Sequence, residues 1–124
     1  MNTISNKKFT ISLHEKGYYE LFIKAGEEVF IEDAHNIRDA QKQLCGKRLP
    51  ILISGGQFSI TNIETLKYIA KNVNMPYSKV SAYIAESIPQ KILGNFYLKI
   101  YKPERPTQFF NHKADALEWI KQYL

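Results

Sequence analysis

Apolar strands and amphipathic helices alternate in the last third of the chain, and this alternation constrains the fold more than any other feature. Residues 79–86 are largely apolar and predict a buried strand, and the periodic apolar residues of 89–101 predict a helix that two prolines end. A short strand is expected at 107–110, before a last helix capped by Asn111. Strands separated by helices in this way pair in parallel through right-handed crossovers.

Earlier in the chain, alternating and apolar segments predict three more strands and two more helices. We place the strands at 9–13, 18–24 and 49–54, and the helices at about 33–45 and from Thr61 onward. The first two strands are close enough in sequence for an antiparallel hairpin. The element order is therefore β-β-α-β-α-β-α-β-α. It predicts an α/β fold with a single-layer mixed sheet of about five strands and about four helices.

Capping residues mark the ends of the two earlier helices. Asp33 is placed at the N-cap of the first helix and Gly46 at its C-cap. Thr61 and Glu64 have the spacing of a capping box. The second helix is therefore expected to begin at Thr61.

Length and composition indicate one globular domain over residues 1–124, in which 1–7 are expected to be flexible. The net charge of +5 is modest and is not concentrated in basic runs, so we expect no nucleic-acid partner. A single cysteine, Cys45, excludes an internal disulfide. With no apolar leader at the N-terminus, this predicts a cytoplasmic protein. No apolar stretch approaches the ~20 residues that span a bilayer.

The residues that carry common enzyme chemistry are scattered. The three histidines lie on separate predicted elements without ligand spacing. Ser54 is not part of a nucleophile elbow, and Cys45 has no catalytic signature around it. The Gly55-Gly56 pair follows a strand but lacks the remainder of a phosphate-binding loop. We therefore predict a non-enzymatic protein with no catalytic residue, cofactor or metal.

The third predicted helix has an unusually broad apolar arc. Phe96, Tyr97 and Tyr101 belong to this arc, which covers about half of the helix circumference at 100° per residue, and lysines gather on the opposite side. Neighbouring helices and the proline-containing linker are one explanation for the breadth. A dimer mate or partner protein is a second, and an apolar ligand or a membrane surface is a third. Phe96, Tyr97 and Tyr101 are accordingly our candidate interaction or ligand surface.

Several segments of the second half resemble the uncharacterised SpoIIAA-like, STAS-type bacterial proteins, in the branch common in Bacteroidetes-type bacteria. These segments are 79–87, 93–99, 102–106, 109–110 and 116–120. The resemblance implies a domain rich in βαβ units, with a mixed sheet of STAS topology and usually without enzymatic activity. Other members of this group are compared with lipid-carrying CRAL-TRIO domains, which makes an apolar ligand conceivable.

The resemblance also implies a candidate partner loop. In anti-sigma-factor antagonists, a serine at the start of the helix after the third strand is phosphorylated by a partner kinase. Ser54-Gly55 matches the opening of that pattern and places the acceptor at Thr61, although the preceding acidic residue and the second glycine are absent. Helix capping alone also explains Thr61. The candidate loop residues are Ser54, Gly55, Gly56, Ser59 and Thr61.

Together these features favour a cytoplasmic regulatory or protein-interaction module that binds a protein partner or forms a homodimer. The alternative is a binding protein for a lipid or other apolar small molecule, at most peripheral at a membrane. If the broad arc is an interface, Tyr97→Glu should weaken self-association more than stability.

Overall fold

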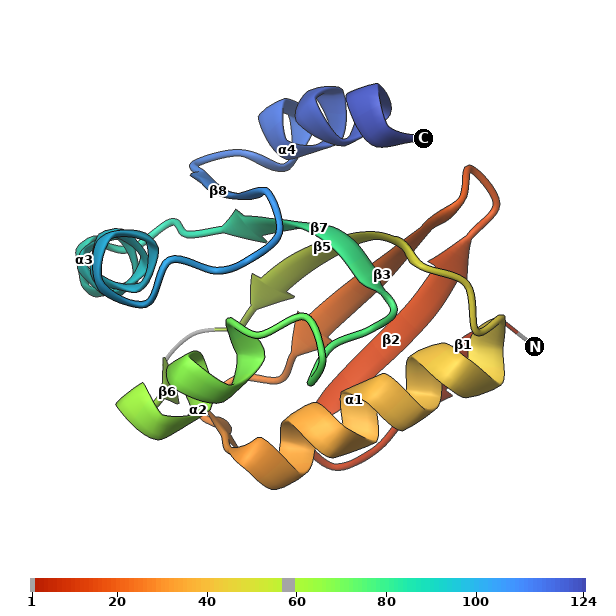
Figure 1. Cartoon of the computed structure of the whole chain (residues 1–124), viewed down its shortest axis with the longest axis horizontal. Helices are drawn as coiled ribbons and strands as arrows, with labels where there is room; N and C mark the ends of the chain where they lie inside the picture. The colour runs from red at the N-terminus through yellow and green to blue at the C-terminus, as the bar shows by residue number, and fades with distance from the viewer. Residues whose placement is uncertain (1, 57–59) are drawn as a thin grey trace.

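A six-stranded mixed sheet forms the centre of the computed structural model, which describes residues 2–56 and 60–124 (Figure 1). Its strands, in the order in which they pair, are β1 (Thr3–Ser5), β2 (Phe9–His14), β3 (Tyr18–Ile23), β5 (Leu49–Gly55), β7 (Ser78–Ile84) and β8 (Thr107–Phe110). The first three strands are antiparallel, and β3, β5, β7 and β8 are parallel. The mixed sheet and the parallel pairing of the later strands confirm the predicted fold class.

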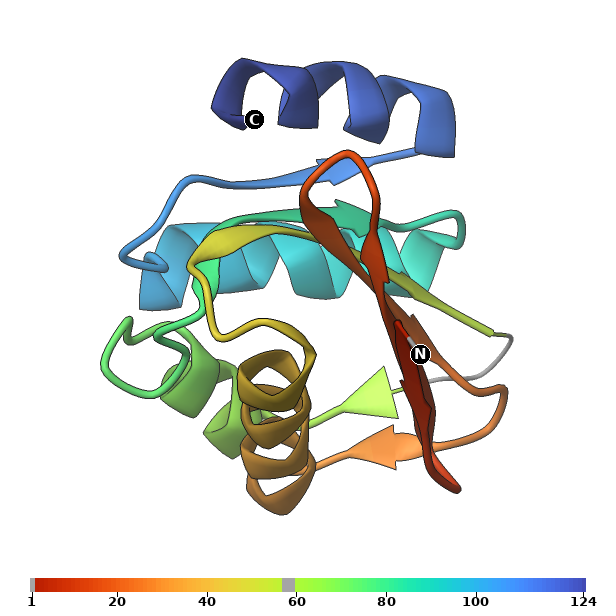
Figure 2. The same ribbon diagram turned by 90° about the vertical axis from the view of Figure 1, so that its right-hand side faces the viewer.

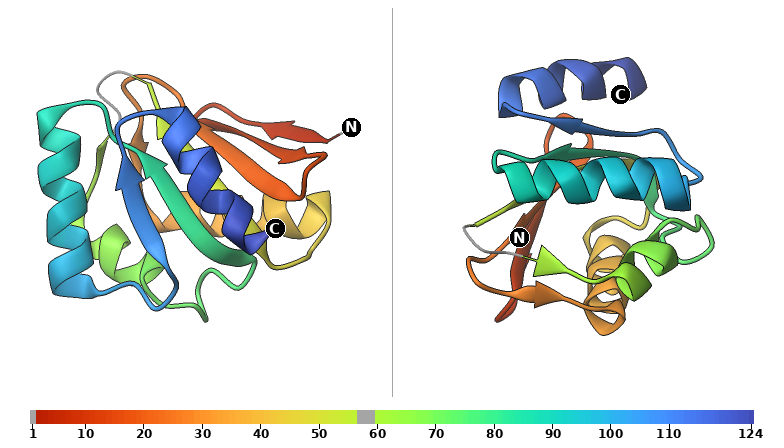
Figure 3. Two further views of the ribbon diagram at one scale, coloured as in Figure 1. Left: turned by 90° about the horizontal axis from the view of Figure 1, so that it is seen from above. Right: turned by 90° about the vertical axis from the view of Figure 1, so that its left-hand side faces the viewer.

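The helices form layers on both faces of this sheet. They are α1 (Ile31–Leu44), α2 (Ile63–Ile69), α3 (Ile88–Phe96), its π-helical continuation η1 (Tyr97–Tyr101), α4 (Lys113–Ile120) and the short 3₁₀ turn η2 (Lys121–Tyr123). Figures 1 and 2 show α1 and α2 below the sheet and α4 above it. Figure 3 shows α3 lying along the β8 edge. No helix of the described residues is long and apolar enough to cross a membrane.

Side-chain alternation along the strands creates two apolar layers. Ile11, Leu21 and Ile51 point to the face that α1 covers, where they form a core with Ala34 and Ile37. Residues of the opposite parity pack against α4 on the other face, in a smaller cluster of Tyr18, Leu52, Ala82, Ala116 and Ile120. The two clusters explain why β5 and β7 are largely apolar, since both of their faces are covered.

At its edges the fold differs from the one predicted from the sequence. The N-terminal segment, expected to be flexible, supplies β1, in which Ile4 pairs with Ile11 of β2, so the sheet has six strands instead of about five. A two-stranded parallel ribbon of β4 (Glu28–Val29) and β6 (Ile60–Thr61), visible side by side in Figure 2, was also missed. Segments of two or three residues are too short to show a hydrophobic period.

The helix caps lie one to three residues from the predicted positions. The N-cap of α1 is Phe30, and Asp33 instead accepts a hydrogen bond from the Phe30 backbone nitrogen at 2.8 Å. The C-cap is Cys45, and Gly46 follows it with a left-handed φ of 66°, a conformation that glycine adopts at low cost. His112, not Asn111, is the N-cap of α4.

Candidate functional site

The start of the candidate partner loop is part of the sheet. Ser54 and Gly55 end β5 and pair with Phe22 and Ile23 of β3. Gly56 then approaches Ala25 so closely that a Cβ atom on it would lie 2.7 Å from the Ala25 backbone nitrogen. Gly56 is therefore required by backbone packing. Ser59 lies outside the described residues.

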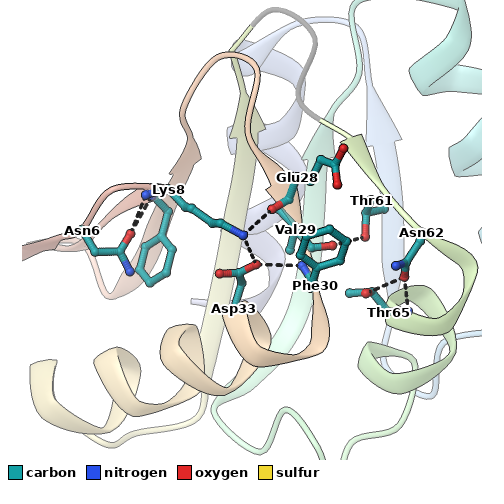
Figure 4. Close-up of polar contacts among 10 residues, drawn as sticks. Asn6, Lys8, Glu28, Val29, Phe30, Asp33, Thr61, Asn62 and Thr65 are labelled. Atoms are coloured by element: carbon teal, nitrogen blue, oxygen red, sulfur yellow. Dashed lines mark hydrogen bonds and ion pairs between the residues drawn. The ribbon is translucent and has the colours of Figure 1, made fainter.

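Thr61, the last residue of the candidate loop, belongs to β6 and is not a helix cap. Its hydroxyl donates to the Val29 carbonyl at 2.9 Å, across the β4–β6 ribbon (Figure 4). The cap of α2 is Asn62, whose Oδ1 accepts from the Thr65 nitrogen at 2.8 Å and from the Thr65 hydroxyl at 2.7 Å. The capping-box prediction at Thr61 was wrong because the next residue is also a strong capping residue, and only one of the two can take that place.

A lysine fixes the same ribbon to the start of α1. Lys8 Nζ lies 3.0 Å from Asp33 Oδ2, donates to the Glu28 carbonyl at 3.0 Å, and lies 4.8 Å from the centre of the Phe30 ring (Figure 4). The Asp33 side chain is mostly buried, so this ion pair is better shielded from water than an exposed one. These contacts give the polar residues around Thr61 a structural role.

The candidate surface on the third helix divides into two sides. Tyr97 is only 1% exposed and forms a cluster with Leu66 of α2 and with Ala70, the C-cap of this helix, so it is not part of the outer surface. Tyr101 is half-buried, and Phe96 is 37% exposed. We therefore no longer expect Tyr97→Glu to act mainly on self-association. A carboxylate at this position would be buried and would destabilise the fold directly.

The outer side of the helix carries a row of exposed apolar side chains at every fourth position, which we call the outer row. It consists of Ile88, Ile92, Phe96 and Ile100, of which Ile88 is 71% and Ile92 65% exposed. Residues four apart lie on the same face of a helix, so these side chains form one continuous stripe. Lys91 and Lys99 are exposed, and each directly precedes a residue of the row in sequence, so both lie beside it along one side.

The spacing of the outer row is present in the sequence, but it could not be separated from the rest of the broad apolar arc. Because α3 lies beside the edge of the sheet, only the inner half of the arc, which includes Tyr97 and Leu93, packs against the rest of the protein. Gly94 permits this packing, since a Cβ there would lie 2.7 Å from the Phe109 ring of β8. The outer half is left in solvent.

An apolar cavity of about 190 Å³ lies on the inner side of α3, between this helix, α2 and the sheet. Its walls include Ile37, Ile51 and Leu66, and almost all of its lining is apolar. The exposed Gly55 and the half-buried Ile84 also line it, so the cavity opens near the carboxyl ends of β5 and β7. Ligands of open α/β sheets bind at this end of parallel strands.

Two polar side chains in the cavity wall are unusual. Arg105 is 4% exposed, and its guanidinium donates to the Ser81 hydroxyl at 3.0 Å, to the Asn72 side-chain oxygen at 3.1 Å and to the Ile69 carbonyl. Tyr97 also lines the cavity, and its buried hydroxyl has no hydrogen-bond partner among the described residues. Burial raises the pKa of Tyr97, and the positive charge of Arg105 acts in the opposite direction.

Comparison with known proteins identifies the family of this chain. A family described as "Domain of unknown function (DUF7793)" matches residues 15–124. The chain belongs to this family. No curated protein matches the chain.

Among solved structures, the chain is similar to an uncharacterised protein of the DUF3478 family, with a SpoIIAA-like fold, from Shewanella loihica PV-4. The TM-score is 0.55 at 20% sequence identity, and the match covers 94% of this chain and 98% of the other. At this identity the likeness shows the fold alone. The SpoIIAA-like fold that the sequence resemblance implied is thereby confirmed.

Proposed function

We propose that this protein is a non-enzymatic STAS-like interaction module that binds a protein partner through the outer row of α3. The observation that carries the proposal is the exposure of Ile88, Ile92, Phe96 and Ile100 on one helix face. Scattered exposed apolar residues are ordinary, whereas a continuous apolar stripe on a surface indicates a binding site. An apolar helix face that docks against a complementary groove is a common recognition mode.

Charge indicates what kind of partner fits this face. Residues 88–101 contain two lysines, Lys91 and Lys99, and no acidic residue. A second copy of the chain would bring together two segments of the same charge, which opposes association. A partner with an apolar patch bordered by carboxylates would complement both the outer row and its lysine edge. We therefore favour a different protein over a homodimer.

Affinity capture from the native cytosol, with the full-length protein as bait, tests this proposal. Ile92 is 65% exposed, so Ile92→Glu should leave the free energy of unfolding within about 0.5 kcal/mol of wild type while placing a charge in the outer row. The matched control is Val73→Glu, because Val73 is 82% exposed and lies outside the row. We expect a protein that wild type and Val73→Glu retain and Ile92→Glu loses.

Two other outcomes would contradict the proposal. If wild type sediments as a dimer that Ile92→Glu dissociates, the outer row binds a second copy of the chain. If wild type floats with phosphatidylglycerol-containing vesicles and Ile92→Glu does not, the row with Lys91 and Lys99 is a membrane contact.

A further inference from the structure

Arg105 is a buried cation without a counter-ion. Its side chain forms no ion pair within the two described segments, and its acceptors on Ile69, Asn72 and Ser81 are all neutral. The Ile69 carbonyl ends α2 and carries part of the negative end of the helix dipole, equivalent to only about half a charge. Buried charges in proteins are normally paired, because an isolated one is costly to desolvate.

Arg105 also has hydrogen-bonding capacity left. A guanidinium has five N–H donors in a planar fork. Three of them have acceptors, on Ser81, Asn72 and Ile69, which leaves two without one in the described part of the chain. A planar fork with free donors suits a carboxylate.

Tyr97 lines the same cavity as Arg105. The charge of Arg105 acts on both Tyr97 and Tyr83, whose rings meet edge-on with their centres 6.4 Å apart. The Tyr97 hydroxyl is buried without a partner, an arrangement that costs free energy unless something else supplies an acceptor. A buried anion would satisfy Tyr97 and Arg105 together.

The remainder of the cavity wall is suited to hydrocarbon. At about 190 Å³ the cavity is larger than the engineered apolar cavity of roughly 150 Å³ that binds benzene. It can therefore hold a ring or a short alkyl chain, and its opening near Gly55 and Ile84 gives such a molecule access.

We propose that this cavity binds a small apolar carboxylic acid, with the carboxylate at Arg105 and Tyr97 and the hydrocarbon between α2, α3 and the sheet. The carboxylate supplies the missing counter-charge and accepts hydrogen bonds from the guanidinium and the phenol. The apolar walls contribute through removal of hydrocarbon surface from water. This site is separate from the outer row, which lies on the opposite side of the same helix.

Isothermal titration of the full chain at pH 7 tests the proposal with two pairs of probes. The acids are benzoate and hexanoate, and the matched neutral compounds are benzyl alcohol and hexan-1-ol. We expect each acid to bind at least ten times more tightly than its alcohol, because charge-assisted hydrogen bonds are about twice as strong as neutral ones. Equal binding of acid and alcohol, or no binding by either acid, overturns the proposal, including the case of a cavity that holds only water.

A conservative variant tests the contact between the carboxylate and the Tyr97 hydroxyl. Tyr97→Phe keeps the ring and removes the hydroxyl, so we expect the preference for acid over alcohol to fall about tenfold. Tyr18→Phe is the matched control, since Tyr18 is also buried but packs against α4 on the other face of the sheet. An acid preference unchanged in Tyr97→Phe, or reduced equally by both variants, contradicts the assigned contact.

The position of the bound acid is measured independently of any variant. Nuclear Overhauser effects from the benzoate ring protons should reach the methyl groups of Ile37 and Leu66, which are buried in the cavity wall. Contacts to Leu117 of α4 instead, or contacts with exposed methyl groups alone, would overturn the assigned location.

Discussion

At the scale of single residues, Tyr97 shows how burial alters what a side chain does. The sequence placed it on an apolar helix arc, and the structure buries it with an unpartnered hydroxyl. Without ligand, Tyr97→Phe should raise the free energy of unfolding by about 1 kcal/mol, because it removes an unsatisfied polar group and keeps the ring in place. Urea unfolding of the two proteins measures this. A loss of 1 kcal/mol or more would show that the hydroxyl has a buried partner.

Tyr97 should also make the free energy of unfolding depend on pH in the alkaline range. Burial raises the pKa of Tyr97 above its ordinary value of 10.0, so the folded protein keeps a proton that the unfolded chain releases above about pH 10. The stabilisation is complete below that pH and is lost as the pH rises further. Urea unfolding midpoints between pH 8 and pH 11 should fall less steeply in Tyr97→Phe than in wild type. Identical slopes would contradict the raised pKa.

At the scale of secondary-structure elements, the contact of α3 with β8 depends on Gly94. A methyl group there would lie 2.7 Å from the Phe109 ring. This ring is itself stacked on the Tyr83 ring, with the two ring centres 4.7 Å apart. Gly94→Ala gains about 1 kcal/mol of helix propensity, but the overpacking costs about 1–3 kcal/mol. We expect net destabilisation in urea unfolding. Asn95→Ala, on the exposed side, is the control and should be neutral or stabilising.

The elements that the sequence predicted well are those whose ends are marked by turn-forming residues. The strands at 49–54 and 107–110 were predicted almost to the residue, because apolar strands between glycines, prolines and polar turns have clear ends. The pairing of Thr3–Ser5 and the β4–β6 ribbon was not predictable, since such short segments depend on partners elsewhere in the fold.

The candidate site was predictable only in part. Periodicity located the apolar third helix, but which half of its arc is buried follows from its place at the sheet edge, which no local pattern specifies. Arg105 was missed because a lone arginine between two prolines gives no sign that it will be buried. Its burial results from contacts with residues more than twenty positions away in sequence, on α2 and β7.

At the scale of the whole molecule, the two sides of α3 have different proposed roles. Its inner side closes a cavity with a buried cation and an unpartnered phenol, and its outer side presents an apolar row with two lysines. A SpoIIAA-like sheet with helices on both faces supports this helix along its β8 edge (Figure 3). The outer row is the central claim, because it gives the protein its proposed role in partner binding.

Site-specific photocrosslinking in living cells tests that claim most directly. A photoreactive phenylalanine derivative placed at Ile92, in the outer row, is compared with the same group at Val73, which lies outside the row and is even more exposed. We predict a protein adduct of defined mass from position 92 and none of that mass from position 73. The same adducts from both positions, or only self-crosslinked or lipid-linked products from position 92, would contradict the account.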